Sequence, residues 1–373
     1  MGRPRYTIRF IIYLLIFMIL ITVGCSSKTA APVSQGESNP ITAKPSAEKT
    51  TAPVISEPGF TRKNPIPMNT LISIPGWDLK VLEFLRGEEA LKVINTADWQ
   101  AQPLPEGQEY ALAKIYLKCT AMDDNDHSLG ISDIFITGSS NVAYGDTMDG
   151  WPQPEFLYED MYTADEVEGW IDAIIPTDEQ NLMVALNTTS EDVHYTRYIA
   201  LQDGASISLP PELANLSPNE LGADYTKPAV AGQTVITPDW EVTVLTSLSG
   251  ADAEAAMGNG TPEYTPPSEG NEYLLVEVRV RYISKNEAPI WVGGDAFYPI
   301  DTSNGWRLQV DHNYLYGLPE RVWLGKTLLP GAETEGWIYM TIPSGTTQPV
   351  IAFDPQYYPS ERPKGNQRYF LIR

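Results

Sequence analysis

The segment MDDNDHS, residues 122–128, is the best candidate for a metal site in the sequence. Asp123, Asp124 and Asp126 would supply carboxylate oxygens, which are the ligands that Ca²⁺ prefers. An EF-hand loop also requires a glycine at its sixth position and a glutamate at its end, and no register of this segment provides them. Because the segment follows an alternating, strand-like run, we predict a polar turn between strands, with Ca²⁺ binding as the alternative.

Two motifs place carboxylates close together in the sequence: EGQEY at residues 106–110 and EGNEY at residues 269–273. Paired carboxylates can act as general acid and base, but catalysis also needs a positioned partner group, and neither motif has an identifiable one. Histidine occurs at His127, His194 and His312, and none of these stands in a metal-binding spacing. The sequence has no nucleophile elbow and no phosphate-binding glycine-rich loop. We therefore predict no catalytic residue, no cofactor and no enzymatic activity.

The nine tryptophans fall into two groups. Six recur at matching places in the two parts of the chain: Trp77 with Trp240, Trp151 with Trp306, and Trp170 with Trp337. This recurrence favours a role in the fold. Trp99, Trp291 and Trp323 have no counterpart. We predict that these three are the partner-binding aromatics, because an exposed tryptophan can anchor a protein or stack on a sugar.

The N-terminus has the parts of a secretory signal: a basic start, an uncharged apolar run over residues 10–23, and small residues after it. The run is shorter than the roughly 20 residues that a membrane-spanning helix needs. Residues 22–25, TVGC, resemble the lipobox of bacterial lipoproteins. That resemblance implies cleavage after residue 24 and lipidation of Cys25, whose acyl chains would hold the protein on a membrane. The alternative is an uncleaved N-terminal anchor.

Residues 25–68 are rich in Ser, Thr, Pro and Ala and lack hydrophobic periodicity, so they cannot offset the entropy cost of ordering. We predict a disordered tether with a span of roughly 35 Å. The formal net charge of the chain is −23. Residues 1–24 hold three of the 25 basic residues and no acidic ones, so their removal leaves 22 basic and 48 acidic residues, a net charge of −26. Because such a surface repels nucleic acid, we predict no nucleic acid partner.

Six landmarks recur in the same order along the chain and at nearly constant spacing, which indicates a duplicated domain. The matching pairs are WDLKVLEF (77–84) with WEVTVLTS (240–247), EGQEY (106–110) with EGNEY (269–273), DTMDGW (146–151) with DTSNGW (301–306), EGWIDAIIP (168–176) with EGWIYMTIP (335–343), MVALN (183–187) with VIAFD (350–354), and RYIAL (197–201) with RYFLI (368–372).

The runs after the EGxEY motifs alternate as expected of β-strands with one buried face. In the first run this places Cys119 inward, as a small buried hydrophobe without a disulfide partner. Asn304-Gly305 and Pro330-Gly331 are typical of turns between strands. Neither repeat contains a long amphipathic helical pattern. We therefore predict an antiparallel β-sandwich for each repeat.

The second repeat resembles the telokin-like, immunoglobulin-like domain of unknown function that is common in bacterial lipoproteins. The resemblance rests on EGxEY before a strand, the Asn304-Gly305 hairpin, and the run LLPGAETEG at residues 328–336. The first repeat keeps Gly169 but has Thr163-Ala164 in place of Pro330-Gly331, so we expect its turn to be built differently. The resemblance covers residues from about 70 to 203 and from 230 to 373. It implies an immunoglobulin-like sandwich in each repeat and no catalytic residue.

These features predict an all-β chain with a signal peptide over residues 1–24, a tether over 25–68, immunoglobulin-like domains over 69–203 and 230–373, and a linker over 204–229. We predict a lipid-anchored, non-catalytic binding or adhesion module on the extracytoplasmic side of the bacterial cell membrane. Its expected partners are the membrane, through the lipid, and an envelope protein or glycan. The alternatives are a structural spacer of the envelope and a hydrolase with an acidic site between the domains.

Overall fold

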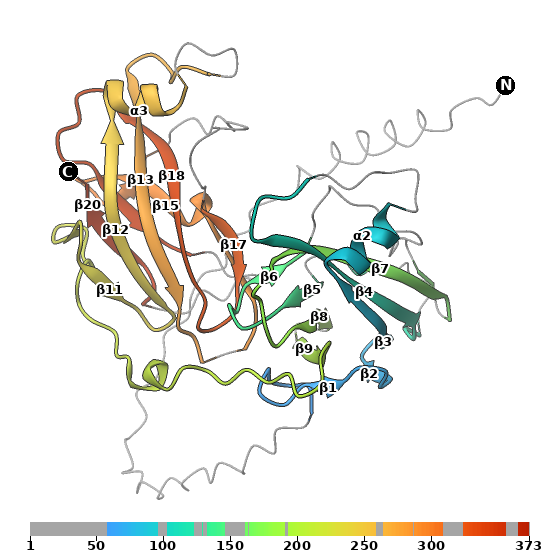
Figure 1. The fold of residues 1–373 in the computed structure, drawn as a ribbon. Coiled ribbons are helices and arrows are strands. Elements are labelled where there is room, and N and C mark those ends of the chain that lie inside the picture. The colour runs from blue at the N-terminus through green and yellow to red at the C-terminus, as the bar shows by residue number, and fades with distance from the viewer. Residues whose placement is uncertain are drawn as a thin grey trace, which may run out of the picture. The chain divides into compact units, whose positions relative to one another are not determined.

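The alternating runs of the sequence form β-strands in the computed structural model of the chain (Figure 1). The structure describes residues 58–95, 103–122, 129, 133–145, 161–162, 164–190, 193–258, 264–285, 287–308, 324–355 and 365–372. Most strand pairs in this part are antiparallel, and its α-helices are only α2 (Glu88–Ile94) and α3 (Gly250–Ala256). The predicted all-β fold is therefore confirmed. None of the helices in the described ranges has the length and apolar character needed to cross a bilayer.

The first sandwich comprises β1 to β9 and has two sheets. Its four-stranded sheet has the order β2 (Ile72–Ile74), β3 (Trp77–Arg86), β4 (Gln108–Cys119), β7 (Glu166–Pro176). Its five-stranded sheet has the order β1 (Ile66–Pro67), β9 (Val193–Ala200), β8 (Met183–Ser190), β5 (Ile134–Thr137), β6 (Ala143–Tyr144).

The second sandwich, β10 to β20, repeats this plan. Its four-stranded sheet has the order β11 (Thr234–Ile236), β12 (Trp240–Ser249), β13 (Asn271–Tyr282), β18 (Glu333–Pro343). Its five-stranded sheet has the order β10 (Ala229–Val230), β20 (Arg368–Leu371), β19 (Val350–Phe353), β15 (Phe297–Asp301), β16 (Trp306–Arg307). A two-stranded sheet of β14 (Ile290–Gly293) and β17 (Gly325–Leu328) and the 3₁₀ helices η1 (Pro211–Asn215) and η2 (Gly294–Ala296) complete the described elements.

Most corresponding strand pairs of the two sandwiches have the same register, whereas β15–β16 is shifted by one residue relative to β5–β6. The corresponding pairs are Trp77–Cys119 with Trp240–Tyr282, Ile134–Leu186 with Phe297–Phe353, and Met183–Ala200 with Val350–Leu371. Even a β-bulge recurs, between Val81 and Glu83 in β3 and between Val244 and Thr246 in β12. The residues of these pairs correspond to one another at the same spacings as the sequence landmarks around them. The internal repeat of the sequence is therefore also present in the structure, at the level of individual paired residues.

Each five-stranded sheet contains one parallel pair, whereas the sequence predicted antiparallel sheets throughout. β1 runs parallel to β9, and β10 runs parallel to β20. β1 lies within the residues that we assigned to the tether, and Ile66 in it is buried. A strand this short cannot show alternation, which is why the sequence did not reveal it. The folded part therefore includes residues from 58 onward, ahead of the predicted boundary at residue 69.

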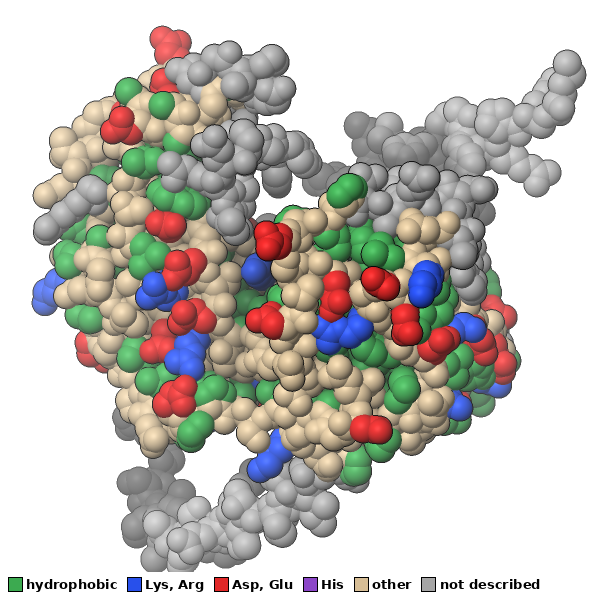
Figure 2. All heavy atoms as spheres, in the orientation of Figure 1, with side chains coloured by type: hydrophobic (Ala, Val, Ile, Leu, Met, Phe, Trp, Pro, Cys, Tyr) green, Lys and Arg blue, Asp and Glu red, His purple; other side chains and the backbone are tan. Residues whose placement is uncertain are grey.

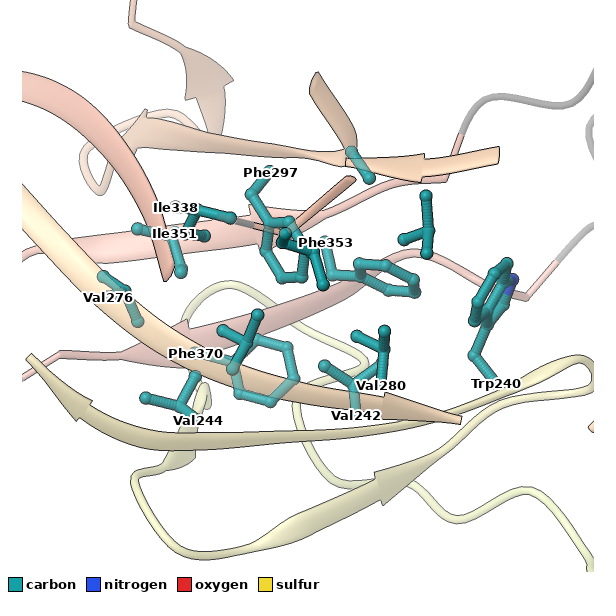
Figure 3. Close-up of a cluster of buried hydrophobic side chains, with 14 of the residues drawn as sticks. Trp240, Val242, Val244, Val276, Val280, Phe297, Ile338, Ile351, Phe353 and Phe370 are labelled. Atoms are coloured by element: carbon teal, nitrogen blue, oxygen red, sulfur yellow. The ribbon is translucent and has the colours of Figure 1, made fainter. Parts of the chain in front are cut away.

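The space between the two sheets of each sandwich is a hydrophobic core. In the second sandwich, Trp240 and Val276 from the four-stranded sheet share one core cluster with Phe353 from the five-stranded sheet (Figure 3). Trp77 and Cys119 belong to the corresponding core of the first sandwich. Cys119 is a buried free thiol, as predicted. The strand alternation in the sequence thus identified the inward faces correctly.

The short helices cover part of the outer face of each four-stranded sheet. α2 packs Ala90 and Ile94 against Tyr110 and Trp170, and α3 packs Ala253 and Met257 against Tyr273 and Trp337. Trp170 and Trp337 therefore lie away from the sandwich cores. The tyrosines of the two EGxEY motifs are buried beneath these helices, which gives the motifs a role in the fold.

Cross-strand ion pairs occupy other outward positions of the same sheets. Lys118 Nζ lies 2.7 Å from Glu166 Oε1 across β4 and β7, and Arg279 pairs with Glu335 across β13 and β18. Figure 2 shows acidic and basic side chains scattered among other types on the face in view. Exposed pairs of this kind contribute at most about 1 kcal/mol each, so they favour the register without determining the fold.

The turns before β7 and β18 have the same geometry. The shared hydrogen bonds are Asp165 N to Tyr162 O (2.9 Å) with Ala332 N to Leu329 O (3.0 Å), and Ala164 N to Cys119 O (2.9 Å) with Gly331 N to Tyr282 O (2.8 Å). Ala164 has a φ of 74°, close to the 97° of Gly331. The expectation of a differently built turn was therefore wrong. Ala164 adopts the left-handed conformation although its Cβ makes that cost about 1–2 kcal/mol.

A packed joint connects the two sandwiches. Leu329, in the turn before β18, belongs to the same apolar cluster as Ala205 and Ile207 of the predicted linker. All three pack on the outer side of the first five-stranded sheet. We call this side the covered face; it consists of Phe135, Met183, Ala185 and Tyr198. The predicted linker is thus part of the folded unit, whose described residues begin at residue 58, and the domain boundaries within that unit stay predictions.

Arg62 lies at this joint and is 0% exposed. Its Nε donates to Glu287 Oε2 at 2.7 Å, and its Nη2 donates to the carbonyl oxygen of Pro330 at 2.9 Å. Its Nη1 donates to Asn141 Oδ1 in the β5–β6 turn. One buried guanidinium therefore bonds to both sandwiches, and its charge is offset by the carboxylate of Glu287.

Candidate functional site

Among the predicted site residues, Trp291 is the one that lies in the described part of the chain. Cys25, Trp99, Trp323 and the candidate calcium ligands Asp123, Asp124 and Asp126 lie outside the described residues. Within the described ranges, no group of three or more His, Cys, Asp or Glu side chains could hold a metal ion. Trp291 is therefore the predicted site residue whose surroundings the structure describes.

Trp291 projects from β14 with 54% of its surface exposed. Its neighbours along the strand, Ile290 and Val292, point into the core, so alternation places the indole on the outer side. Thr327 of β17 lies opposite Trp291, and Gly325 lies opposite Gly293. The exposed tryptophan is thus held on a small sheet whose inner side is anchored in the second core.

Two paired glycines form the floor beneath the indole. A Cβ added at Gly293 would lie 3.0 Å from Trp291 Nε1, and a Cβ added at Gly325 would lie 3.2 Å from Trp291 Cη2. Both distances are too short for ordinary packing, so side chains at these positions would push the ring away. The ring therefore lies across the Gly293–Gly325 pair, with its other face toward solvent. We call this arrangement the Trp291 platform.

Polar groups border the platform. The same Cβ position lies 3.0 Å from Asp295 Oδ1, so this carboxylate also borders Gly293. Asp295 and Lys326 are both exposed. A flat apolar ring beside a hydrogen-bond donor and an acceptor suits a ligand with one apolar face and a rim of hydroxyl groups. Such an arrangement can bind and orient a ligand, and no described residue beside it is paired as a nucleophile and base.

A second group of aromatics lies on the outer side of the second five-stranded sheet. We call it the open face; it consists of Tyr298, Val350, Ala352 and Tyr369, of which Val350 and Ala352 are buried. Ile300, Tyr225 and Leu371 belong to the same cluster. Tyr298 lies opposite Ala352, which lies opposite Tyr369, as Phe135, Ala185 and Tyr198 do on the covered face. Both tyrosines of the open face are only partly buried.

The tyrosines of the open face retain polar contacts. The hydroxyl of Tyr298 donates to Asp354 Oδ2 at 3.1 Å and accepts a hydrogen bond from Gln367 Nε2 at 2.9 Å. Burial, together with the nearby carboxylate of Asp354, raises the pKa of Tyr298 to about 12. The phenol therefore stays protonated at physiological pH and serves as a neutral hydrogen-bonding group rather than as a base.

Trp306 is an exposed aromatic that sequence reasoning placed in the fold. It stands at the start of β16 with 76% of its surface exposed. By strand order β16 corresponds to β6, which begins at Ala143, so Trp306 aligns with Ala143 and not with Trp151. The spacing between DTMDGW and DTSNGW is shorter than the spacings of the other five landmarks, and that difference was the available signal.

The hairpin that ends at Trp306 forms where Asn304-Gly305 predicted one. Gly305 has a φ of 75°, whereas Asn304 is not in the positive-φ region that a type I′ turn would require of both residues. The Gly305 amide donates to the carbonyl of Asp301 at 2.7 Å, and the carboxylate of Asp301 accepts from the backbone of Ser303 at 2.8 Å. The turn is therefore closed by its own polar groups. The hydrogen bonds of Asp301 within the turn indicate a structural role for this aspartate.

The carboxylates of the EGxEY motifs have structural contacts. Arg86 Nε donates to Glu109 Oε1 at 2.6 Å, and the same guanidinium donates to the carbonyls of Thr177 and Glu179. Glu272 accepts from the Gly345 amide at 3.4 Å. Both contacts tie the start of a long strand to the turn beyond the neighbouring strand. Glu106 and Glu269 are exposed.

A surface pocket of about 550 Å³ lies beside the end of β9. Its lining comes from residues 63–69 and 200–206 and includes one carboxylate, that of Asp203, and one ammonium group, that of Lys63. The hydrolase alternative required His194 or His312 beside carboxylates from both repeats. The side chain of His194 and the whole of His312 lie outside the described residues. The hydrolase alternative therefore stays a prediction.

Comparison with solved structures finds partial likenesses. The structure of a candidate lipoprotein, ycdA, from Bacillus subtilis subsp. subtilis str. 168 is 16% identical over 37% of this chain, with a TM-score of 0.28. This chain spans 38% of the length of that protein. The yjhA protein from Bacillus subtilis is 14% identical over 39% of this chain and 98% of its own length, with a TM-score of 0.25.

An uncharacterized β-sandwich protein from Clostridium difficile 630 is 17% identical over 39% of this chain and 100% of its own length, with a TM-score of 0.23. No protein-family model matches the chain, and neither does any curated protein. At these TM-scores the likenesses transfer no ligand and no activity to this chain. The resemblance to telokin-like, immunoglobulin-like domains stays a prediction.

Proposed function

We propose that the protein is a lipid-anchored, non-catalytic binding module of the bacterial cell envelope and that the Trp291 platform binds an envelope glycan. The observation that carries this proposal is the exposed indole lying over Gly293 and Gly325. Pyranose rings present an apolar face of C–H groups, which an indole covers well, and a rim of hydroxyls, which Asp295 and the indole N–H would bind.

The N-terminal sequence supports the location. Lipid on Cys25 and a tether over residues 25–68 would keep the platform near the membrane and within reach of wall polymers. The net charge of −26 that follows from signal cleavage favours a neutral glycan over an anionic polymer, because like charges repel.

The test is cosedimentation of the full-length, detergent-solubilised protein with purified cell-wall glycan from its host. We expect the wild type to bind, and we expect Trp291→Ala to weaken binding by at least about tenfold, as loss of a central aromatic typically does. Gly325→Ala should weaken binding as well, because the added Cβ displaces the ring while the tryptophan itself is retained.

Trp306→Ala is the matched control, because it removes an even more exposed tryptophan at another place in the second sandwich. It should leave binding within about twofold of the wild type. Failure of the wild type to bind glycan, or equal loss in Trp291→Ala and Trp306→Ala, would contradict the proposal. In the first case the spacer hypothesis, which the packed joint at Arg62 favours, becomes the better explanation.

A further inference from the structure

The joint inside the chain provides a template for a contact between chains. In the joint, the Leu329 turn of the second sandwich packs on the covered face of the first sandwich. Backbone groups fix its position: the Leu329 amide donates to the Asn141 carbonyl at 2.8 Å, and Val142 forms a β-bridge with Leu328. The joint therefore joins a sheet face on one sandwich to a turn on its sister.

The second sandwich has the same sheet face, and it is the open face. Its row Tyr298–Ala352–Tyr369 matches the row Phe135–Ala185–Tyr198 of the covered face. Tyr198 is 0% exposed on the covered face, whereas its counterpart Tyr369 is only partly buried. The strands of the receiving face are thus present a second time, with Val350 and Ala352 buried in one cluster with Tyr225. Among the described residues, no counterpart of Leu329 belongs to that cluster.

The first sandwich has the same turn. Tyr162 occupies the place of Leu329, because the hydrogen bonds of the two turns match and the two residues stand equally far ahead of Gly169 in β7 and Gly336 in β18. Tyr162 is 53% exposed. A large, largely apolar side chain at the tip of a turn is therefore exposed. This turn is the counterpart of the Leu329 turn, which packs on the covered face in the joint.

We propose that the protein associates head to tail, with the open face of one copy receiving the Tyr162 turn of a second copy. This contact repeats between chains the arrangement that Leu329 and the covered face have within the chain. Because the contact joins two different surfaces, a pair of copies still has one unused open face and one unused Tyr162 turn. Further copies can add at these surfaces, which gives rings or linear assemblies.

The chemistry of the two surfaces suits a reversible contact. Tyr225 takes the position of Arg62, since it stands as far ahead of β10 as Arg62 stands ahead of β1. It packs against Gly305 of the β15–β16 turn, as Arg62 contacts Asn141 of the β5–β6 turn. A phenol replaces the buried charge, so the free surface carries no desolvation penalty for an unpaired guanidinium. Tyrosines on both sides are stable in water and can pack in a contact.

The charge of the chain sets how the association should respond to salt. Two copies with a formal net charge of −23 each repel one another, and salt screens this repulsion. The association should therefore tighten as salt is raised. A partner attracted by opposite charge would show the reverse dependence.

The first experiment measures self-association of the full-length protein in detergent micelles by sedimentation equilibrium. Tyr162→Ala should raise the dissociation constant at least about tenfold, as removal of a buried aromatic anchor does. Tyr162→Leu, which installs the residue of the internal joint, should keep the wild-type value within about threefold. Leu71→Ala, which shortens an exposed apolar side chain elsewhere, should have no effect.

The second experiment identifies the surfaces by cross-linking in membranes. Tyr162→Cys and Tyr298→Cys, co-expressed as separate chains, should form a mixed disulfide under mild oxidation, whereas Tyr162→Cys with Leu71→Cys should not. A chain with both Tyr162→Cys and Tyr298→Cys should form a ladder of oligomers. The proposal is overturned if the wild type stays monomeric at every concentration and salt, or if Tyr162→Cys alone cross-links as well as the mixed pair.

Discussion

The covered face and the open face have the same strands in the same register, yet one is sealed and the other is partly exposed. On the covered face, Phe135 and Tyr198 are almost completely inaccessible, beneath Leu329 and Ile207. On the open face, Tyr298 and Tyr369 remain partly exposed. The difference shows that strand pairing fixes which residues share a face, whereas the segments that follow decide whether that face is buried.

The residue types agree with this difference. The covered face has Phe135 where the open face has Tyr298, and the hydroxyl of Tyr298 is bonded to Asp354 and Gln367. Phenylalanine has no polar group to lose when a segment covers it, whereas tyrosine keeps a group that can bind water at an exposed place. The duplicated faces have therefore diverged in chemistry while their geometry has stayed the same.

The largest effect should come from breaking the joint beside the covered face. Arg62→Ala should lower the free energy of unfolding by about 3–5 kcal/mol, because it leaves the Pro330 carbonyl and the Asn141 side chain without their buried partner. Urea unfolding followed by tryptophan fluorescence would measure it. Arg279→Ala, which breaks an exposed pair with Glu335, should cost less than about 1 kcal/mol. Equal costs would mean that the joint is not locked by Arg62.

A truncation at equivalent positions tests the comparison directly. Phe135→Ala should cost about 3–5 kcal/mol, because it leaves a cavity under Leu329. Tyr298→Ala should cost about 1–2 kcal/mol, because its ring is partly solvated already. The difference in unfolding free energy between the two variants, measured in one titration series, is the decisive quantity. A cost for Tyr298→Ala as large as that for Phe135→Ala would show that the open face is sealed as well.

The smallest effects should come from the two sister turns, and they should have opposite signs. Gly331→Ala should destabilise by about 1–2 kcal/mol, because φ is 97° and the new Cβ would lie 3.1 Å from Asn141 Nδ2. Ala164→Gly should stabilise by about 0.5–1 kcal/mol, because it relieves the same strain at a φ of 74°. Thermal unfolding of both variants would measure the shifts. Two shifts of the same sign would be inconsistent with matching turns.

Much of the fold could be predicted because the chain repeats itself. Two copies of one alternating pattern fixed the inward register at Cys119, which lies in the first core. The recurring Trp77 and Trp240 lie in the cores as well. The repeat could not predict the joint, because a contact between copies has no second example in the sequence. Arg62 lies in a short polar stretch, TRKN, and only long-range contacts turn it into a buried residue.

The candidate site was predicted in part for the same reason. Trp291 was selected because it lacks a counterpart, and the structure places it on the surface. Its floor was missed, because Gly293 and Gly325 lie far apart in the sequence and only strand pairing brings them together. Trp306 was missed because a sequence match with Trp151 suggested a shared structural role that strand order does not support.

Arg62 also determines how the fold would bear a mechanical load. A pull on the chain ahead of residue 58 acts first on the loop around Gly59, whose carbonyl accepts from the Tyr198 amide at 2.8 Å, and then on Arg62. The Arg62 carbonyl accepts from the Ile207 amide at 2.9 Å, and its side chain holds Glu287 and Pro330. The force therefore reaches both sandwiches at once, before it can peel β1 from β9. In a protein pulled from its N-terminal end, Arg62 would distribute the load over both sandwiches and so protect the short strand β1 from being detached first.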